Sequence, residues 1–348
     1  MKTIHIGHHF FGSGNLGDDL MLAGFLEGLK VANTKLRCCI PHPIESIAKR
    51  FPTILWESYT EENRSKSIKQ CDLWLGVGGT PFQSNVSDWF IKHLESEYNF
   101  CHLYRKPMAF IGIGCQDVQS FRYPILKRVI ESADAIWTRD TLTHELITKH
   151  TQLANCYPAS DLAHIFLREH SLKAIKPGRL SVALNFDYQN WPSLTQTITS
   201  LSRLNPSEQL WLIQEKRPLP GSEQWLYTHS NADIQNNWQL VSLDHPEKPL
   251  TEVIDNWPSS EWLLTSRFHT CLVSAWAGTK TVVLNTNSKL LSAAVEFGYQ
   301  ALPPNVCSES ILDALISAKA PIHSAMHAKA DLAQYAMDEL IAHFKLKD

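Results

Sequence analysis

The sequence predicts an α/β fold with two Rossmann-like domains that face each other across a cleft. Short apolar runs alternate with helical patterns along the chain, which is typical of parallel sheets covered by helices. Several of these runs end in glycine-rich turns or polar residues, and ligands bind beyond the carboxyl ends of parallel strands. The length of 348 residues suits two domains of ordinary size.

Composition narrows the functional class. With 44% hydrophobic and 19% charged residues the chain is globular, and a net charge of -3 gives no general attraction to nucleic acid or anionic lipid. The eight cysteines lack Cys-x-x-Cys and metal-ligand spacing, which indicates a reducing compartment and no metal site. The apolar start is too short for a signal peptide, and no run is long enough to span a membrane. We expect a cytoplasmic protein, either free or peripheral at the inner face of the membrane, and the oligomeric state stays open.

The chain opens with a predicted strand over residues 3–8, a glycine-rich loop over 12–17 and an apolar helix. The loop has the Gly-x-Gly-x-x-Gly spacing of dinucleotide sites. However, Asp18 and Asp19 would repel a pyrophosphate at the start of this helix. They suit hydroxyl binding or proton abstraction better, and the alternative is that one of them caps the helix.

Two further apolar runs of the first half, residues 71–77 and 107–113, also end in glycine turns. Gly78 and Gly79 follow the first run and Gly114 follows the second. Each could be a tight turn in which only glycine fits. Because three such turns follow parallel strands, we expect them to line one cleft.

Arg139 lies at the carboxyl end of the predicted strand over residues 133–140 and should point to the same cleft. The alternative is a structural ion pair with Asp140 or Asp134.

The domain boundary is predicted in the polar segment of residues 173–178, which contains proline and glycine. We therefore expect an N-terminal domain over 1–172 and a C-terminal domain over 179–322. A final helix, in residues 323–348, is expected to pack back on the N-terminal domain.

The second half contains a strand that ends in Ser266-Arg267-Phe268-His269-Thr270 and turns directly into a helix. This pattern places a fixed cation, a titratable imidazole and a helix N-terminus together. Backbone N–H groups at a helix N-terminus bind anions, and an adjacent arginine favours phosphate or carboxylate. The sequence predicts an anion site here.

Six motifs in fixed order extend over nearly the whole chain. They are Gly14-Asn15-Leu16-Gly17-Asp18-Asp19-x-x-Leu22, Cys71-Asp72-Leu73-x-Leu75-x-Val77-Gly78-Gly79, residues 107–114, Ala133-Asp134-x-x-x-Thr138-Arg139-Asp140, Arg267-Phe268-His269 and Lys289. In this order they resemble the polysaccharide pyruvyl transferase family. The resemblance implies a GT-B-like architecture with the active site between the domains. It also implies transfer of the pyruvyl group of phosphoenolpyruvate to two sugar hydroxyls, which gives a cyclic ketal and free phosphate.

The resemblance further implies that Arg139, Arg267, His269 and Lys289 bind the donor. The last three belong to the C-terminal domain, which is the donor side, and Arg139 lies at a strand end in the N-terminal half. Asp18, on the acceptor side, becomes the candidate general base, with Asp19 as the alternative. The other residues expected to contact substrate are Asn15, Gly17, Asp19, Gly78, Gly79 and Gly114. The chain departs from the usual family pattern at three places, which are Phe268, the run Asn285-Thr286-Asn287-Ser288 before Lys289, and Thr80 after the glycine pair.

The implied chemistry needs no cofactor or metal. Phosphoenolpyruvate carries about three negative charges, which the two arginines and Lys289 could bind. His269 would be the general acid that protonates the methylene carbon, since imidazole titrates near neutrality. Asp18 or Asp19 would accept the proton of the attacking hydroxyl.

Two other functions fit the sequence. One is a GT-B glycosyltransferase that uses a nucleotide sugar, and the other is a catalytically silent glycan-binding protein. The acceptor, either a soluble glycan or a lipid-linked precursor of an exopolysaccharide or cell-envelope polymer, stays open. Trp89, Trp191 and Trp225 are candidates for stacking on a sugar.

Overall fold

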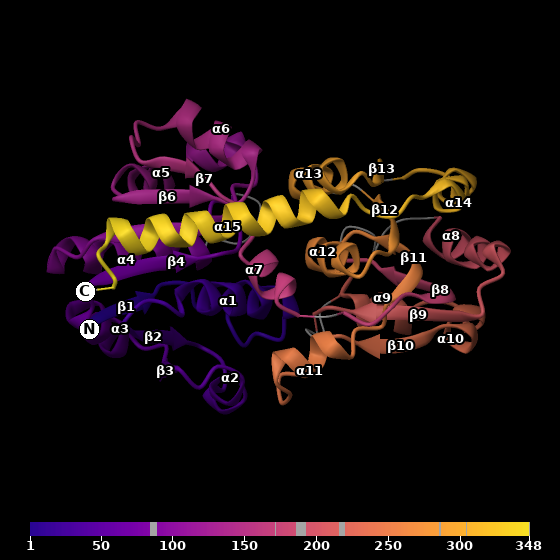
Figure 1. The fold of residues 1–348 in the computed structure, drawn as a ribbon, viewed down its shortest axis with the longest axis horizontal. Helices are drawn as coiled ribbons and strands as arrows, with labels where there is room; N and C mark the ends of the chain where they lie inside the picture. The colour runs from indigo at the N-terminus through magenta and orange to yellow at the C-terminus, as the bar shows by residue number, and fades with distance from the viewer. Residues whose placement is uncertain are drawn as a thin grey trace. The chain divides into compact units, whose positions relative to one another are not determined.

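The computed structural model describes residues 1–83, 89–170, 172–185, 193–215, 220–284, 287–303 and 305–347. The chain divides into two compact units. The first comprises Met1–Ser13, Asp18–Phe166 and Ala328–Asp348, and the second comprises Gly14–Gly17 and Leu167–His327. Figure 1 shows strands that run side by side in each unit, flanked by helices.

In the described part of the first unit, seven parallel strands form a sheet in the order β3-β2-β1-β4-β5-β6-β7. The strands are β1 (Lys2–Ile6), β2 (Thr34–Ile40), β3 (Ile54–Ser58), β4 (Leu73–Val77), β5 (Met108–Ile113), β6 (Ala135–Thr138) and β7 (Cys156–Pro158). Strands β4 and β5 are apolar and buried along their whole length, as central parallel strands must be. The strand order reverses between β1 and β4, and ligands bind at such a point in open α/β sheets.

The helices of the first unit connect these strands. They are α1 (Leu16–Leu29), α2 (Ile44–Arg50), α3 (Glu61–Gln70), α4 (Trp89–Tyr104), the 3₁₀ helix η1 (Val118–Arg122), α5 (Pro124–Glu131), α6 (Thr141–His150) and α7 (Ala163–Arg168). Local sequence explains several of their starts. Thr60 caps α3, Asp140 caps α6, and Pro124 occupies the first turn of α5.

In the described part of the second unit, six parallel strands form a sheet in the order β10-β9-β8-β11-β12-β13. The strands are β8 (Lys176–Ala183), β9 (Glu208–Ile213), β10 (Gln239–Ser242), β11 (Ser260–Thr265), β12 (Lys280–Leu284) and β13 (Gln300–Leu302). The order reverses between β8 and β11. The end of β11 is where the predicted anion site begins.

The helices of the second unit are short apart from the last, which continues into the first unit. They are α8 (Leu194–Ser200), the 3₁₀ helix η3 (Leu201–Leu204), α9 (Glu223–Thr228), α10 (Ala232–Asn237), α11 (Leu250–Asp255), α12 (Phe268–Trp276), α13 (Ser288–Phe297), α14 (Ser308–Ser317) and α15 (His323–His343). From Ala328 onward α15 belongs to the first unit, where Nε1 of Trp137 donates a hydrogen bond to Glu339 at 3.1 Å.

Each unit is a parallel sheet with helices, which confirms the predicted α/β fold class. Some predicted ends of strands and helices are wrong. The first strand ends at Ile6, before residue 8. Strand β8 already begins at Lys176, inside the segment predicted as a linker. Helix α1 begins at Leu16, so Asp18 and Asp19 lie within its first turn and neither is its N-cap.

The core of the first unit contains a buried ionic network that the sequence does not reveal. Glu97 is 0% exposed and accepts hydrogen bonds from Arg64 and from the Trp74 indole, both at 2.8 Å. His5 lies 3.4 Å from the same carboxylate. Burial would raise the pKa of Glu97, but the hydrogen bond from His5 and the charges of His93 and His5 outweigh it and lower the pKa to about 2. The network joins β1, β4, α3 and α4.

Candidate functional site

In the first unit, three predicted site residues come together at the carboxyl ends of β4, β5 and β6. Arg139, which follows β6, donates to the Gly79 carbonyl at 3.4 Å and to the Thr80 hydroxyl at 3.3 Å. A Cβ at Gly114 would lie 2.4 Å from Nη2 of Arg139, so only glycine leaves room for this guanidinium. Thr80, at which the chain departs from the family pattern, therefore contacts Arg139, a residue of another motif.

Two carboxylates lie near Arg139 at longer distances. Nε is 3.5 Å from Asp140, and Nη1 is 3.9 Å from the buried Asp161. The predicted alternative of an ion pair with Asp140 is therefore present. The described residues show no pair with Asp134, which precedes β6 whereas Arg139 follows it, and which accepts the Met108 N–H at 2.8 Å.

Gly78 is enclosed by α1 and has a φ of 62°, in the left-handed region that favours glycine. A Cβ there would lie 2.7 Å from Sδ of Met21. The same sulfur accepts the Gly79 N–H at 3.0 Å. These glycines fix the turn after β4 against the helix that carries the acidic pair.

The two aspartates at the start of α1, Asp18 and Asp19, differ in burial. Asp19 is buried and forms an ion pair with Arg50, whose side chain is buried as well. Asp18 is only partly buried. Arg50 thus compensates the charge of Asp19 within the fold.

In the second unit, Arg267 leaves the end of β11 and lies between two acidic side chains. Its Nη2 donates to Glu215 at 2.7 Å, and its Nε lies 2.9 Å from Glu223. Glu223 is 0% exposed. Burial raises the pKa of Glu223 above its ordinary value, although the Arg267 charge acts in the opposite direction.

Sequence reasoning missed these carboxylates, although a signal was present. Gln214 and Glu215 directly follow the apolar run of β9, just as Arg267 follows the run of β11. Polar residues at the end of a buried parallel strand were the feature that singled out Arg267, and the same feature applies here.

His269 is the second residue of α12 and is 8% exposed. Two neighbouring residues pack against its ring. A Cβ at Gly17 would lie 2.1 Å from Nδ1, so the backbone of Gly17 packs directly on the imidazole. The ring of Phe268, another departure from the family pattern, meets it edge-on at a centroid distance of 5.0 Å and an angle of 84°. Two predicted motifs far apart in sequence thus meet at this histidine.

Lys289 lies in the first turn of α13 and is partly buried. This helix follows β12, the neighbour of β11 in the sheet, and Asn287 caps it by accepting the Leu290 N–H at 3.1 Å. Lys289 therefore starts from the same edge of the sheet as Arg267.

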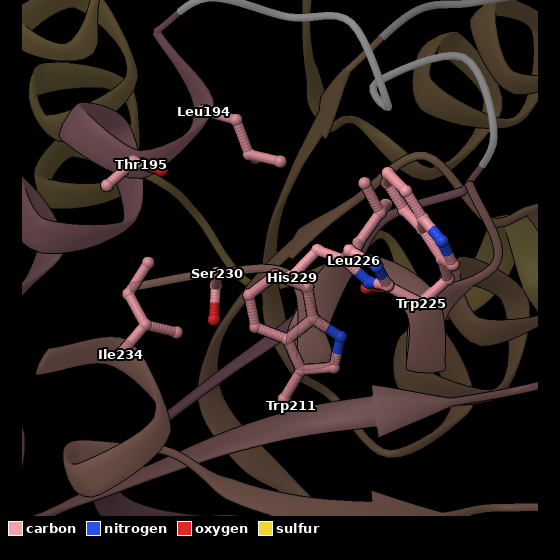
Figure 2. A pocket seen from close by; sticks show the side chains of 8 residues that line it. All are labelled: Leu194, Thr195, Trp211, Trp225, Leu226, His229, Ser230 and Ile234. Carbon is pink, nitrogen blue, oxygen red and sulfur yellow. The ribbon is translucent and has the colours of Figure 1, made fainter. Parts of the chain in front are cut away.

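A cavity of about 150 Å³ lies elsewhere in the second unit, among α8, α9, α10 and β9 (Figure 2). It is lined by Leu194, Thr195, Trp211, Trp225, Leu226, His229, Ser230 and Ile234. None of the predicted catalytic or donor-binding residues lines it. The indole of Trp225, a predicted sugar platform, stacks on His229 at 4.0 Å and 18°. The side chain of Trp89 and all of Trp191 lie outside the described residues.

The described residues contain no group of three or more His, Cys, Asp or Glu side chains that could hold a metal ion. Within the same residues, no helix is long and apolar enough to cross a bilayer.

Solved structures with the same two-domain fold share little sequence with this chain. A putative UDP-N-acetylglucosamine 2-epimerase from Listeria monocytogenes superposes with a TM-score of 0.63 at 11% identity, covering 99% of this chain and 95% of the other. The S. aureus MnaA–UDP co-structure gives 0.65 at 11% identity, with 99% and 96% covered. Anabaena Alr3699/HepE in complex with UDP gives 0.62 at 10% identity, with 99% of each chain covered. At such identities these likenesses show a GT-B-like two-domain fold alone.

Comparison with curated protein sequences finds no match. The family model described as polysaccharide pyruvyl transferase, in contrast, matches residues 15–288. That range covers most of the chain and contains the Gly17 and His269 motifs that meet in the second unit. The chain therefore belongs to the polysaccharide pyruvyl transferase family.

Proposed function

We propose that the protein transfers the pyruvyl group of phosphoenolpyruvate to a sugar residue of a polysaccharide or glycan precursor. The product is a pyruvate ketal, and phosphate is released. The observation that carries this proposal is the packing of Gly17 on the imidazole of His269, one residue after the start of α12. It joins two motifs of the family around one titratable group beside a helix N-terminus.

The donor carries about three negative charges and needs cations. Glu215 and Glu223 balance the charge of Arg267, so donor binding at this guanidinium would have to share it with both carboxylates. The contacts of Arg139 with its acidic neighbours are longer, at 3.5 and 3.9 Å. Arg139 and Lys289 are the other cations expected to bind the donor, and Arg267 is fixed in orientation by its two partners.

His269 acts as the general acid. It gives a proton to the methylene carbon of the donor, which becomes a methyl group while C2 becomes electrophilic. A sugar hydroxyl attacks C2 and gives its proton to Asp18, our choice of base because it matches the acidic residue of the family's Gly-Asp pair. The C2–O bond to phosphate then breaks, and the second hydroxyl closes the ketal. Over the cycle the two hydroxyl protons end on the methyl carbon and on the phosphate.

The second candidate is a glycosyltransferase that uses a nucleotide sugar. It is favoured by one observation, the likeness of the fold to structures solved with UDP. The two functions require different donors, so one assay separates them.

The test is phosphate release from phosphoenolpyruvate with and without a panel of hexosides and N-acetylhexosaminides. We expect release that depends on one of these acceptors and that is lost in His269→Gln. The variant Ser181→Ala, which changes a buried hydroxyl bonded to Ser260 within the same sheet, serves as the matched control. Hydrolysis of a UDP-sugar, with no phosphate released from phosphoenolpyruvate by any acceptor, would contradict the proposal.

A further inference from the structure

Gln214 lies at the end of β9, is 4% exposed, and has hydrogen bonds at all its polar groups. Its backbone N–H donates to Glu223 at 3.3 Å, and its carbonyl accepts the Leu16 N–H at 3.3 Å. Its side-chain oxygen accepts from the N–H and from the hydroxyl of Thr270, both at 2.9 Å. Its side-chain nitrogen donates to Oδ1 of Asn15 at 3.1 Å. A buried amide with this many partners is costly to replace.

The chemistry of these partners fixes the orientation of the Gln214 amide. A backbone N–H can only donate, so the amide oxygen must face Thr270 and the amide nitrogen must face Asn15. The Asn15 oxygen also accepts the Gly17 N–H at 3.2 Å. One chain of hydrogen bonds therefore runs from the first turn of α12 through Gln214 to the Asn15–Gly17 segment.

Both ends of this chain lie next to His269. Thr270 is the following residue, and its N–H belongs to the helix turn that carries the imidazole. Gly17 packs on Nδ1 of the ring. Gln214 does not need to touch the imidazole. It bonds the backbone N–H of Thr270 in α12, and through Asn15 it holds the Gly17 segment that packs on the ring.

We propose that Gln214 is a positioning residue that sets the imidazole of His269 for proton transfer. This inference rests on the proposed function, in which His269 is the general acid. It also changes the role of Asn15, which the sequence assigned to substrate. The Asn15 oxygen serves the hydrogen-bond chain, so Asn15 acts through His269. Small displacements of a catalytic group reduce the rate of the chemical step more than they reduce binding.

Steady-state kinetics with the acceptor that supports turnover test this role. We expect Gln214→Ala to lower kcat by about ten- to hundredfold, while the KM for phosphoenolpyruvate changes by less than about threefold. Gln214→Glu keeps an oxygen for Thr270 but loses the donor to Asn15, so its kcat should fall between wild type and Gln214→Ala. The pH profile of kcat should shift in Gln214→Ala and stay fixed in Ser181→Ala. Wild-type kcat and pH profile in Gln214→Ala would overturn the proposal.

A double-mutant cycle identifies the path through Asn15. If the two side chains act through one hydrogen bond, Asn15→Ala and Gln214→Ala combined should cost hardly more than the larger single effect. Additive losses in kcat would contradict the hydrogen-bond chain.

A second readout separates failure of this inference from failure of the proposed function. The imidazole NMR signal of His269, assigned by its loss in His269→Gln, should shift and broaden in Gln214→Ala with no substrate present. If no acceptor supports turnover, the proposed function fails and this signal still tests the positioning. An unchanged signal in Gln214→Ala would overturn the positioning role, even in an active pyruvyl transferase.

Discussion

Two buried glutamates, one in each unit, have opposite pKa shifts. Both Glu97 and Glu223 are 0% exposed. In the first unit, burial raises the pKa of Glu97, but hydrogen bonds and positive charges lower it to about 2. In the second unit, burial dominates and raises the pKa of Glu223 despite Arg267. The Oε2 atom of Glu223 has no hydrogen-bond partner among the described residues.

The difference lies in the groups that surround each carboxylate. The carboxylate of Glu97 is fully bonded and ties helices to strands, so it stabilises the fold. Glu223 shares Arg267 with a second buried carboxylate, Glu215. Perturbed carboxyl pKa values of this kind are common at functional sites.

The largest effect is expected for Glu97→Gln. Removing this charge leaves Arg64 buried without its partner, and breaking a buried pair costs about 3–5 kcal/mol. Urea unfolding measures the loss, with the exposed Glu95→Gln of the same helix as the matched control. A loss below about 1 kcal/mol would contradict the structural role of the network.

Arg267→Gln comes next, because it removes the guanidinium that lies 2.7 Å from Glu215 and 2.9 Å from Glu223, both of which are buried. We expect a loss of about 2–4 kcal/mol in the free energy of unfolding. Adding Glu223→Gln should restore part of it, since one of the two opposed charges is removed. If the double variant is less stable than Arg267→Gln alone, Glu223 is not part of a charge conflict.

Arg139→Gln should weaken donor binding, besides the loss of stability expected from removing a buried cation near Asp161. A charge-assisted hydrogen bond contributes about 1.5–3 kcal/mol, so the KM for phosphoenolpyruvate should rise by about ten- to hundredfold. Thermal shift provides a parallel measurement, in which phosphoenolpyruvate stabilises wild type and fails to stabilise this variant. An unchanged shift would remove Arg139 from the donor site.

The smallest effect, in Glu223→Gln, has a distinctive pH dependence. A raised pKa means that the folded state keeps a proton that the unfolded state loses, so this contribution to stability is present below the unfolded pKa. It is lost as the pH rises through the folded pKa. Wild type should therefore lose stability relative to Glu223→Gln as the pH rises above the ordinary carboxyl pKa, measured by urea unfolding at a series of pH values. For Glu97 the sign is opposite, because its stabilisation is lost as the pH falls from about 4.5 toward about 2. If the difference in stability between wild type and Glu223→Gln stays constant at all pH values, Glu223 does not have a raised pKa.

The sequence predicted the features that depend on short-range patterns. Apolar runs with polar ends located the strands, and they also located Arg139, Gly79 and Gly114, which do lie together. Gln214 carried the same pattern, but an amide at a strand end has no obvious chemistry until its partners are seen. The buried Glu97 network was out of reach, because its members come from separate helices and strands and only tertiary packing joins them.

The prediction that Asp18 or Asp19 caps α1 failed for a simple reason. Asp18 and Asp19 are good capping residues by type, yet the helix starts two residues earlier, at Leu16. Asn15, which directly precedes it, is an equally good capping type, and sequence alone does not rank the two.

Transfer of the pyruvyl group can be followed at the donor carbon. Phosphoenolpyruvate labelled with ¹³C at C2 is incubated with the protein and the active acceptor, and the product is examined by NMR. We expect a labelled quaternary ketal carbon bonded to two sugar oxygens and bearing a methyl group, which His269→Gln fails to form. Label found only in free pyruvate or unreacted donor, while a UDP-sugar is consumed, would contradict pyruvyl transfer.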